Sequence, residues 1–139
     1  MDVEQLGKVS QILEALDEAG RHKLLALARR RHVAAGAAIF KEGDRGDEFF
    51  VVAKGKVRVS VDDVGASKEV AVLEHGSIFG EMAVLSGGIR SATVTALEEV
   101  DLVAFPGPAV EGLLAGYPAA REALHRIGVI RAEQLIEST

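Results

Sequence analysis

The sequence has no cysteine and no tryptophan, only three prolines, and aromatic residues at only 4% of its positions. Without cysteine, a disulfide framework, a catalytic thiolate and a cysteine-based zinc site are all excluded. Hydrophobic residues still make up 48% of the chain, so the core must be built mainly from valine, leucine, isoleucine and alanine. The 15 glycines, beside so few prolines, predict tight turns rather than proline-rich linkers.

An excess of positive charge is also lacking, because the formal net charge is −5. A free-standing nucleic-acid binder normally has a basic surface, so we expect no direct binding of nucleic acid. A single local arginine can still hold a small anion. No stretch approaches the roughly 20 apolar residues of a membrane span, and the N-terminus lacks the basic and apolar regions of a signal peptide. We therefore expect a cytoplasmic protein with no membrane segment in this chain.

The length of 139 residues fits one domain, residues 1–139. Its first part, residues 1–31, is predicted to form N-terminal helices, because apolar residues recur there at helical spacing, at Val9, Ile12, Leu13 and Leu16 and again over residues 24–28. The arginines at 29–31 close this segment. We expect them to form a solvated helix end, where cations favour the helix dipole; a basic patch for nucleic acid or acidic lipid is the alternative.

The middle of the chain, residues 32–105, changes to a β pattern. Val57, Val59 and Val61 alternate with polar residues, which is typical of a half-buried strand. Further short apolar runs, separated by turn residues, predict strands at 39–40, 49–52, 70–73, 91–96 and 100–105. Such spacing indicates a sandwich, a barrel or a jelly roll. The fold class is therefore mainly β with flanking helices.

Residues 106–139 are again predicted to be helical. Pro106 and Pro108 suit a helix entrance, where a missing N–H costs nothing. Gly116 suits the end of that helix, and Pro118 then opens a longer one.

The chemistry is concentrated in residues 79–94. Gly80 allows the backbone to approach a ligand closely, and the N–H groups of a helix that begins there attract an anion. The planar fork of Arg90 can bind a phosphate through two hydrogen bonds, with the Ser91 hydroxyl beside it. A ribose phosphate would suit both signs of charge, because its sugar hydroxyl can donate to Glu81. From residue types alone, the alternative is that Glu81 and Arg90 pair with each other and that Gly80 is only a turn.

This stretch resembles the phosphate-binding cassette of cyclic-nucleotide-binding domains. The family pattern is Phe-Gly-Glu, a small apolar helix, a variable loop, then Arg followed by Ser, Thr or Ala, and then Ala-x-Val. The matching residues are Phe79, Gly80, Glu81, Met82 and Ala83, followed by Arg90, Ser91, Ala92, Thr93 and Val94. The resemblance continues upstream through Gly36, Ile39, Phe40, residues 42–44, residues 49–52 and residues 55–59. With the flanking helices it covers nearly the whole chain.

The resemblance implies an eight-stranded β-roll that binds cAMP or cGMP. Glu81 would accept a hydrogen bond from the ribose 2′-hydroxyl, Arg90 would pair with the cyclic phosphate, and Ser91 would contact the phosphate through its backbone and hydroxyl. Backbone N–H groups around Gly80 and Met82 would meet the ribose and phosphate. The C-terminal helix would be a lid over the base. There Arg131 matches a base-contacting arginine of some bacterial channel domains, or is an exposed helix residue, and the apolar lid candidates are Ile127, Ile130 and Leu135.

One position departs from the family pattern. Most members have proline just before the arginine, whereas this chain has Ile89 after two glycines. We hypothesise that the freer loop makes ligand capture weaker or slower than in a proline-containing homologue, because ordering it on binding costs more. Ser91 is compatible with both nucleotides. We favour cAMP because serine also occurs there in bacterial cAMP binders of the family.

No catalytic or metal-binding pattern stands beside this motif. The four histidines have no neighbour at metal-ligand spacing, so we expect no enzyme, no metal and no cofactor other than the nucleotide ligand. A metal-dependent jelly-roll enzyme would need clustered histidines. No helix-turn-helix follows the β-rich part, so we do not expect a complete transcription factor. We expect either a stand-alone sensor or the regulatory piece of a larger channel or enzyme, with an effector protein or domain that this sequence does not identify. The alternative is a β-roll interaction domain that binds no nucleotide.

Overall fold

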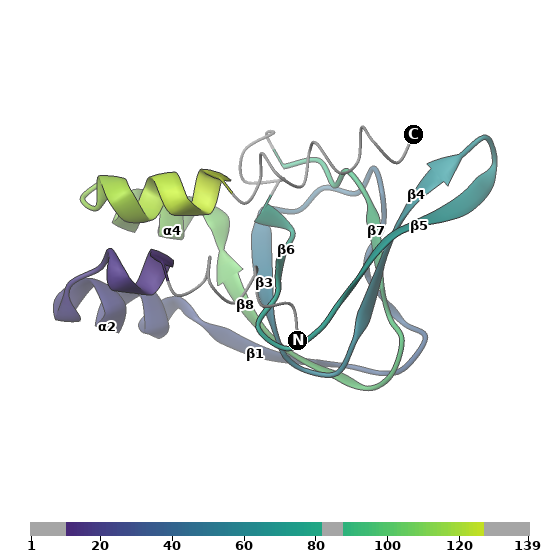
Figure 1. The fold of residues 1–139 in the computed structure, drawn as a ribbon, viewed down its shortest axis with the longest axis horizontal. Helices are drawn as coiled ribbons and strands as arrows, with labels where there is room; N and C mark the ends of the chain where they lie inside the picture. Colours follow the sequence, from purple (N-terminus) through teal and green to yellow (C-terminus); the bar gives the residue numbers. More distant parts are fainter. Residues whose placement is uncertain (1–10, 82–87, 127–139) are drawn as a thin grey trace.

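The computed structural model describes residues 11–81 and 88–126. In this part of the chain, eight strands form two antiparallel sheets, and the helices gather at one end of them (Figure 1). The strands are β1 (Arg29–Val33), β2 (Ala38–Phe40), β3 (Glu48–Lys54), β4 (Val57–Asp63), β5 (Ala66–Leu73), β6 (Ile78–Phe79), β7 (Thr93–Ala96) and β8 (Val100–Pro106). The helices are α2 (Glu18–Leu27) and α4 (Gly107–Leu114), with further helical residues at 11–14 and 118–126. The predicted mainly β fold with flanking helices is confirmed.

The two sheets have four strands each, in the orders β1-β8-β3-β6 and β2-β7-β4-β5. The strand β3 is buried on both faces, which explains its unbroken apolar run. Phe50 and Val52 face the space between the sheets, whereas Phe49 and Val51 face the helices, because successive side chains of a strand point to opposite sides. The short strand β6 repeats this division with Phe79 and Ile78. The strand that leads into the predicted cassette therefore contacts both cores.

The few aromatic side chains are concentrated around these two strands. Three phenylalanine rings pack between the sheets: the centroids of Phe50 and Phe79 lie 5.1 Å apart, and Phe40 lies 6.1 Å from Phe50 and 5.9 Å from Phe79. On the helical side, Phe49 stacks on Phe105 at 5.1 Å. Each ring thus helps to fix the position of another, and the cluster between the sheets includes Phe79, the first residue of the cassette.

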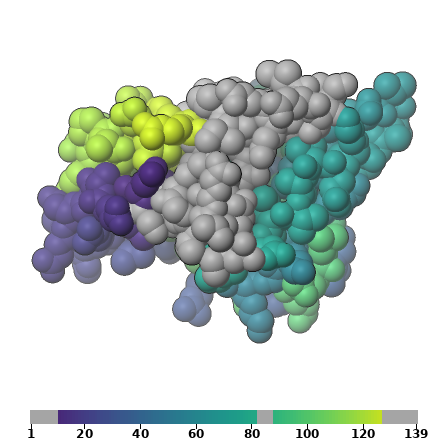
Figure 2. Space-filling view, in the orientation of Figure 1, coloured from purple at the N-terminus to yellow at the C-terminus, as the bar shows by residue number. Residues whose placement is uncertain are grey.

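Asp17 links the N-terminal and C-terminal helical segments by hydrogen bonds. Its carboxylate accepts hydrogen bonds from the Gly20 N–H (2.7 Å), as the N-cap of α2, and from the Tyr117 hydroxyl (2.8 Å) after α4. A Cβ at Gly20 would lie 2.8 Å from the Tyr117 ring, so a residue without a side chain is required there. Figure 2 shows these helices at the opposite end of the molecule from the β4–β5 hairpin.

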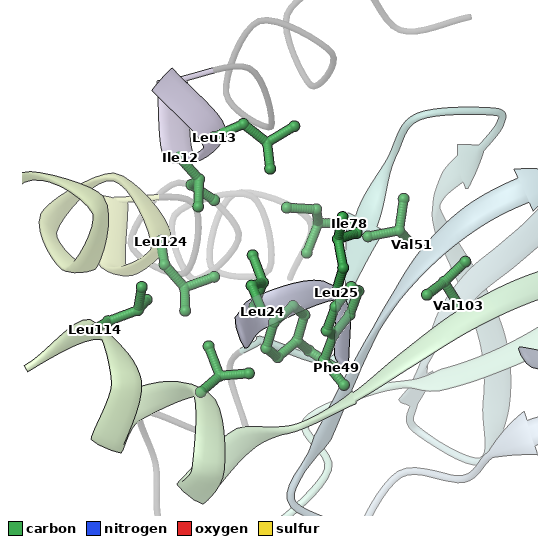
Figure 3. Close-up of a pocket in the computed structure, with 12 residues that line it drawn as sticks. Ile12, Leu13, Leu24, Leu25, Phe49, Val51, Ile78, Val103, Leu114 and Leu124 are labelled. Atoms are coloured by element: carbon green, nitrogen blue, oxygen red, sulfur yellow. The ribbon is translucent and has the colours of Figure 1, made fainter. Parts of the chain in front are cut away.

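A cavity of about 230 Å³ lies between the helices and the first sheet. Its lining is entirely apolar. Figure 3 shows Leu24 and Leu114 reaching it from the helices, and Phe49, Val51 and Ile78 reaching it from the strands. The packing between the helices and β6 therefore leaves unfilled space.

The prediction that residues 29–31 end a helix is wrong. The helix α2 stops at Leu27, Ala28 is extended, and the three arginines form most of β1, paired in register from Arg29 with Ala104 to Val33 with Val100. Pairing with a distant strand overrides the local sequence here. The β region therefore begins at residue 29 rather than 32. Strand β6 was not predicted, and β7 begins at Thr93 rather than at residue 91.

Candidate functional site

The predicted site residues that the structure describes lie around the end of β6 and the start of β7. Phe79 ends β6, Gly80 follows it with φ +85°, and Glu81 is helical and 1% exposed. On the other side, Arg90 is 5% exposed and precedes Ser91 and Ala92, which lie in a bend before β7. The remaining predicted site residues, Met82, Ala83 and Arg131, and the lid candidates Ile127, Ile130 and Leu135 lie outside the described residues.

The Arg90 guanidinium is anchored by one of its terminal nitrogens. Nη1 donates to the carbonyl oxygens of Glu48 (2.8 Å) and Gly80 (3.2 Å). These two bonds use both hydrogens of Nη1. Within residues 11–81 and 88–126, neither Nε nor Nη2 makes a hydrogen bond, and Nε is buried. The Nε–Nη2 edge therefore keeps the paired donors that bind a phosphate in a bidentate manner.

Gly80 is needed for this anchoring. A Cβ at this position would lie 3.1 Å from Arg90 Nη1 and 3.1 Å from the Glu48 carbonyl oxygen, and its φ of +85° disfavours other residues. The chain thus folds closely around the arginine at this point. Gly80 is therefore more than a turn residue, because its carbonyl oxygen accepts a hydrogen bond from Arg90, the residue predicted to bind the phosphate.

The backbone on either side of Arg90 is tied to the loop between β2 and β3. The Arg90 N–H donates to Asp44 O (2.9 Å), the Gly43 N–H donates to Arg90 O (2.8 Å), and the Gly46 N–H donates to Gly88 O (2.8 Å). The bonds donated by Arg90 and Gly46 form an isolated antiparallel bridge centred on Arg45 and Ile89. The arginine is therefore placed by two loops from distant parts of the sequence.

The electrostatics of Arg90 are those of a partly desolvated cation among acidic residues. Burial lowers the pKa of the guanidinium, whereas the charges of Glu48, Asp47 and Asp44 oppose this shift and that of Arg31 adds to it. An arginine keeps its proton under such conditions. A charge that is poorly solvated by water gains more from an added anion than an exposed charge does.

One observation bears on whether Arg90 pairs with Glu81 or forms part of a ligand site. The hydrogen bonds of Arg90 within the described residues go to main-chain carbonyls. The proposed role of Glu81 toward a ribose stays a prediction.

Sequence reasoning missed two residues at this site. The Cζ atom of Arg90 lies 4.1 Å from the ring centroid of Phe40, and a Cβ at Gly46 would lie 2.7 Å from Arg90 Nη2. Phe40 was noted only as part of a strand and of the upstream resemblance, and Gly46 was not singled out. The Lys41–Asp47 segment is rich in turn residues, but nothing in its sequence indicates which arginine it contacts.

Two other kinds of functional feature are absent from the described part of the chain. No group of three or more histidine or acidic side chains there could hold a metal ion. None of the helices described is long and apolar enough to cross a membrane.

Several known proteins are similar to this chain. A cyclic nucleotide-gated potassium channel of Rhizobium etli is 32% identical over 127 residues, which cover 91% of this chain and 34% of the channel. The crystal structure of Thermus thermophilus catabolite activator protein matches with a TM-score of 0.78 and 29% identity, over 90% of this chain and 59% of that one. The regulatory domain of Toxoplasma gondii PKA, crystallised with cAMP, matches with a TM-score of 0.72 and 26% identity, over 88% and 48%.

This chain therefore spans about a third of the length of the channel. The model of the family described as cyclic nucleotide-binding domain matches residues 30–117. That match includes all eight strands except the first residue of β1, together with α4 and both halves of the cassette. The chain belongs to the cyclic nucleotide-binding domain family.

Proposed function

We propose that this chain is a regulatory module that binds cAMP in preference to cGMP, with no catalytic activity of its own. The observation that carries the proposal is the Arg90 guanidinium: Nη1 is held by two carbonyls, while the Nε–Nη2 edge makes no hydrogen bond within the described residues. Such an edge fits the two exocyclic oxygens of a cyclic phosphate. The similar Toxoplasma regulatory domain, crystallised with cAMP, and Ser91 after the arginine support cAMP as the ligand.

The other cassette residues receive the roles that the family pattern suggests. Glu81 accepts a hydrogen bond from the ribose 2′-hydroxyl, and its nearly complete burial makes this bond strong because the local dielectric is low. Ser91 contacts the phosphate. The N–H groups near Gly80, Met82 and Ala83 complete the sugar-phosphate contacts, with Ala92 packed beneath, and Arg131 contacts the base.

The ligand signal reaches the helices through β6. Phe79 packs between the sheets, whereas its neighbour Ile78 lines the apolar cavity together with Leu24 of α2 and Leu114 of α4. A displacement of the cassette therefore changes the packing of the helices, and the unfilled cavity lets them adjust at low cost. In this proposal the C-terminal helix moves because the nucleotide has different affinities for its two positions.

The proposal also includes an effector on which the module acts. The similar channel is about three times as long as this chain, so the module acts on a further protein or domain, in the cytoplasm.

Isothermal titration of the wild-type protein with cAMP, cGMP and 5′-AMP tests this function. The cyclic nucleotides should bind with micromolar or tighter affinity, cAMP more tightly than cGMP. The matched control 5′-AMP carries the same base and sugar with an open phosphate and should bind much more weakly. Equal binding of cAMP and 5′-AMP would contradict recognition of the cyclic phosphate. Absence of heat with all three, across a broad concentration range, would favour the alternative of an interaction domain without a nucleotide.

A further inference from the structure

We propose that Phe40 and Gly46 are positioning residues for the phosphate-binding arginine. Phe40 supports one face of the Arg90 guanidinium, and the missing side chain of Gly46 keeps open the space beside its Nε–Nη2 edge. This inference rests on the proposed function, since it concerns the same phosphate contact.

Phe40 meets the guanidinium in cation–π geometry. The Arg90 Cζ atom lies 4.1 Å from the Phe40 ring centroid, well inside the roughly 6 Å limit of such contacts. The ring itself is held by its neighbours, with centroids 6.1 Å from Phe50 and 5.9 Å from Phe79. Because the plane of the guanidinium rests on a fixed ring, its orientation is set before a ligand arrives.

Gly46 lies at the edge that would face the phosphate. A Cβ built on Gly46 would lie 2.7 Å from Nη2 and 2.8 Å from Nε of Arg90, but 3.0 Å from Cζ. It would thus be closer to the two donor nitrogens than to the carbon between them, which places it beside the Nε–Nη2 edge. Any residue other than glycine would fill space that an acceptor oxygen needs, or would push the guanidinium away.

Together these contacts fix Nη1 and one face of the guanidinium and leave its Nε–Nη2 edge open. Nη1 is bound to the carbonyls of Glu48 and Gly80, one face rests on Phe40, and Gly46 leaves the Nε–Nη2 edge open. A side chain held in this way loses little freedom on binding, so little binding free energy is spent on immobilising it. The arrangement is a preorganised phosphate fork.

The Phe40 test uses two variants, with cAMP as the probe. Phe40→Leu keeps an apolar side chain and removes the π face, and should weaken cAMP binding about three- to tenfold. Phe40→Tyr keeps the face and should bind as the wild type does. Because Phe40 acts through Arg90, adding Phe40→Leu to Arg90→Gln should not lower the cAMP affinity further. This weak affinity is measured by displacement of a fluorescent cAMP analogue at high cAMP concentration. Equal losses in both backgrounds, or equal affinities of the Leu and Tyr variants, would overturn the role of Phe40.

A spectroscopic measurement locates the contact in the unliganded protein. The Nε–Hε resonance of Arg90 should be shifted by the ring current of Phe40, and the shift should vanish in Phe40→Leu and persist in Phe40→Tyr. An unchanged resonance in Phe40→Leu would show that the ring does not stack on the guanidinium.

The Gly46 test is independent of how well the Phe40 variants fold. The atoms that an alanine Cβ would meet belong to the Arg90 side chain and not to the backbone, so we expect Gly46→Ala to fold, and urea unfolding verifies this. It should nevertheless lose cAMP affinity by about tenfold or more, as for a charge-assisted hydrogen bond. The control is Gly112→Ala in α4, whose Cβ would meet no described atom within 4 Å and which should bind cAMP normally. Normal binding by Gly46→Ala would overturn the role of Gly46.

The experiments distinguish a failure of the proposed function from a failure of the positioning roles. If the wild type binds no cyclic nucleotide, the proposed function fails. If the wild type binds cAMP and Arg90→Gln loses it, but the Phe40 and Gly46 variants bind normally, only the positioning roles fail.

Discussion

Replacing Ile89 by proline should strengthen both the fold and the binding of cAMP. Ile89 occupies the position where the family usually has proline. It lies in the antiparallel bridge opposite Arg45, but the two hydrogen bonds of that bridge use the N–H groups of Arg90 and Gly46. The Ile89 N–H takes part in neither bond, so proline removes none of them. Its side chain is 41% exposed, so little packing is lost.

The size of the effect follows from how strongly residues 88–90 are already held. A compatible proline typically stabilises a protein by about 0.4–1 kcal/mol through the unfolded chain. Because three backbone hydrogen bonds already tie Gly88 and Arg90 to the β2–β3 loop, most of this gain should appear in the free energy of unfolding. The gain in cAMP affinity should then be at most about two- to fivefold, which corresponds to the same energy.

Urea unfolding and calorimetric titration with cAMP measure the two effects. Ile89→Ala is the matched control, since it removes the same side chain without fixing φ, and it should show neither gain. A folded Ile89→Pro protein with unchanged or weaker cAMP affinity would refute the idea that loop freedom limits ligand capture. A loss of stability would show that the bridge needs a backbone angle that proline cannot adopt.

Two further variants test the packing and the charges. At Gly55 (φ +94°) an alanine Cβ would lie 2.6 Å from a main-chain carbonyl oxygen, whereas at Gly36 (φ +85°) it would meet no described atom within 4 Å. In urea unfolding, Gly36→Ala should lower the free energy of unfolding by about 1–3 kcal/mol through its backbone angle, and Gly55→Ala should lower it by about 1–3 kcal/mol more through the close contact. Equal losses of stability in the two variants would contradict the contact at Gly55. Burial raises the pKa of the Glu111 carboxyl, but hydrogen bonds with His125 (2.6 Å) and Arg121 (3.1 Å) outweigh it, so the net pKa lies below its ordinary value of 4.5. The stability that this ionised carboxylate contributes is therefore present above about pH 4.5 and is lost as the pH falls through the lowered pKa. In urea unfolding, Glu111→Gln should be less stable than the wild type at pH 7, and the difference should shrink in acid. A difference in stability that stays constant with pH would show that the Glu111 charge is not its cause.

Sequence reasoning predicted the elements whose own residues carry a periodic pattern. Val57, Val59 and Val61 alternate and do form β4, and Pro106 does stand at the entrance of α4. It failed where pairing with a distant strand decides. The arginines of β1 are exposed and carry no apolar alternation, so only the pairing with β8 makes them a strand. The two residues of β6 are too few to show any period.

The candidate site divides in the same way. Gly80 and Arg90 could be found because they belong to one short motif, and the structure shows their direct contact. Phe40 and Gly46 could not be found, because they are distant from the arginine in the sequence and contact it only through tertiary packing. The motif therefore predicts which residue binds the phosphate, whereas only the fold shows what holds that residue in place.

The most direct test of the account is the dissociation constant of cAMP for the wild type and for Arg90→Gln, with Arg58→Gln as the matched control. Arg58 is a β4 arginine that pairs with Glu69 at the surface (3.1 Å), so its variant should bind cAMP as the wild type does. Arg90→Gln should lose about 2–5 kcal/mol of binding free energy, well over tenfold in affinity, while urea unfolding verifies that it is folded. Wild-type binding at micromolar strength that Arg90→Gln retains would contradict the assignment of Arg90 as the phosphate ligand.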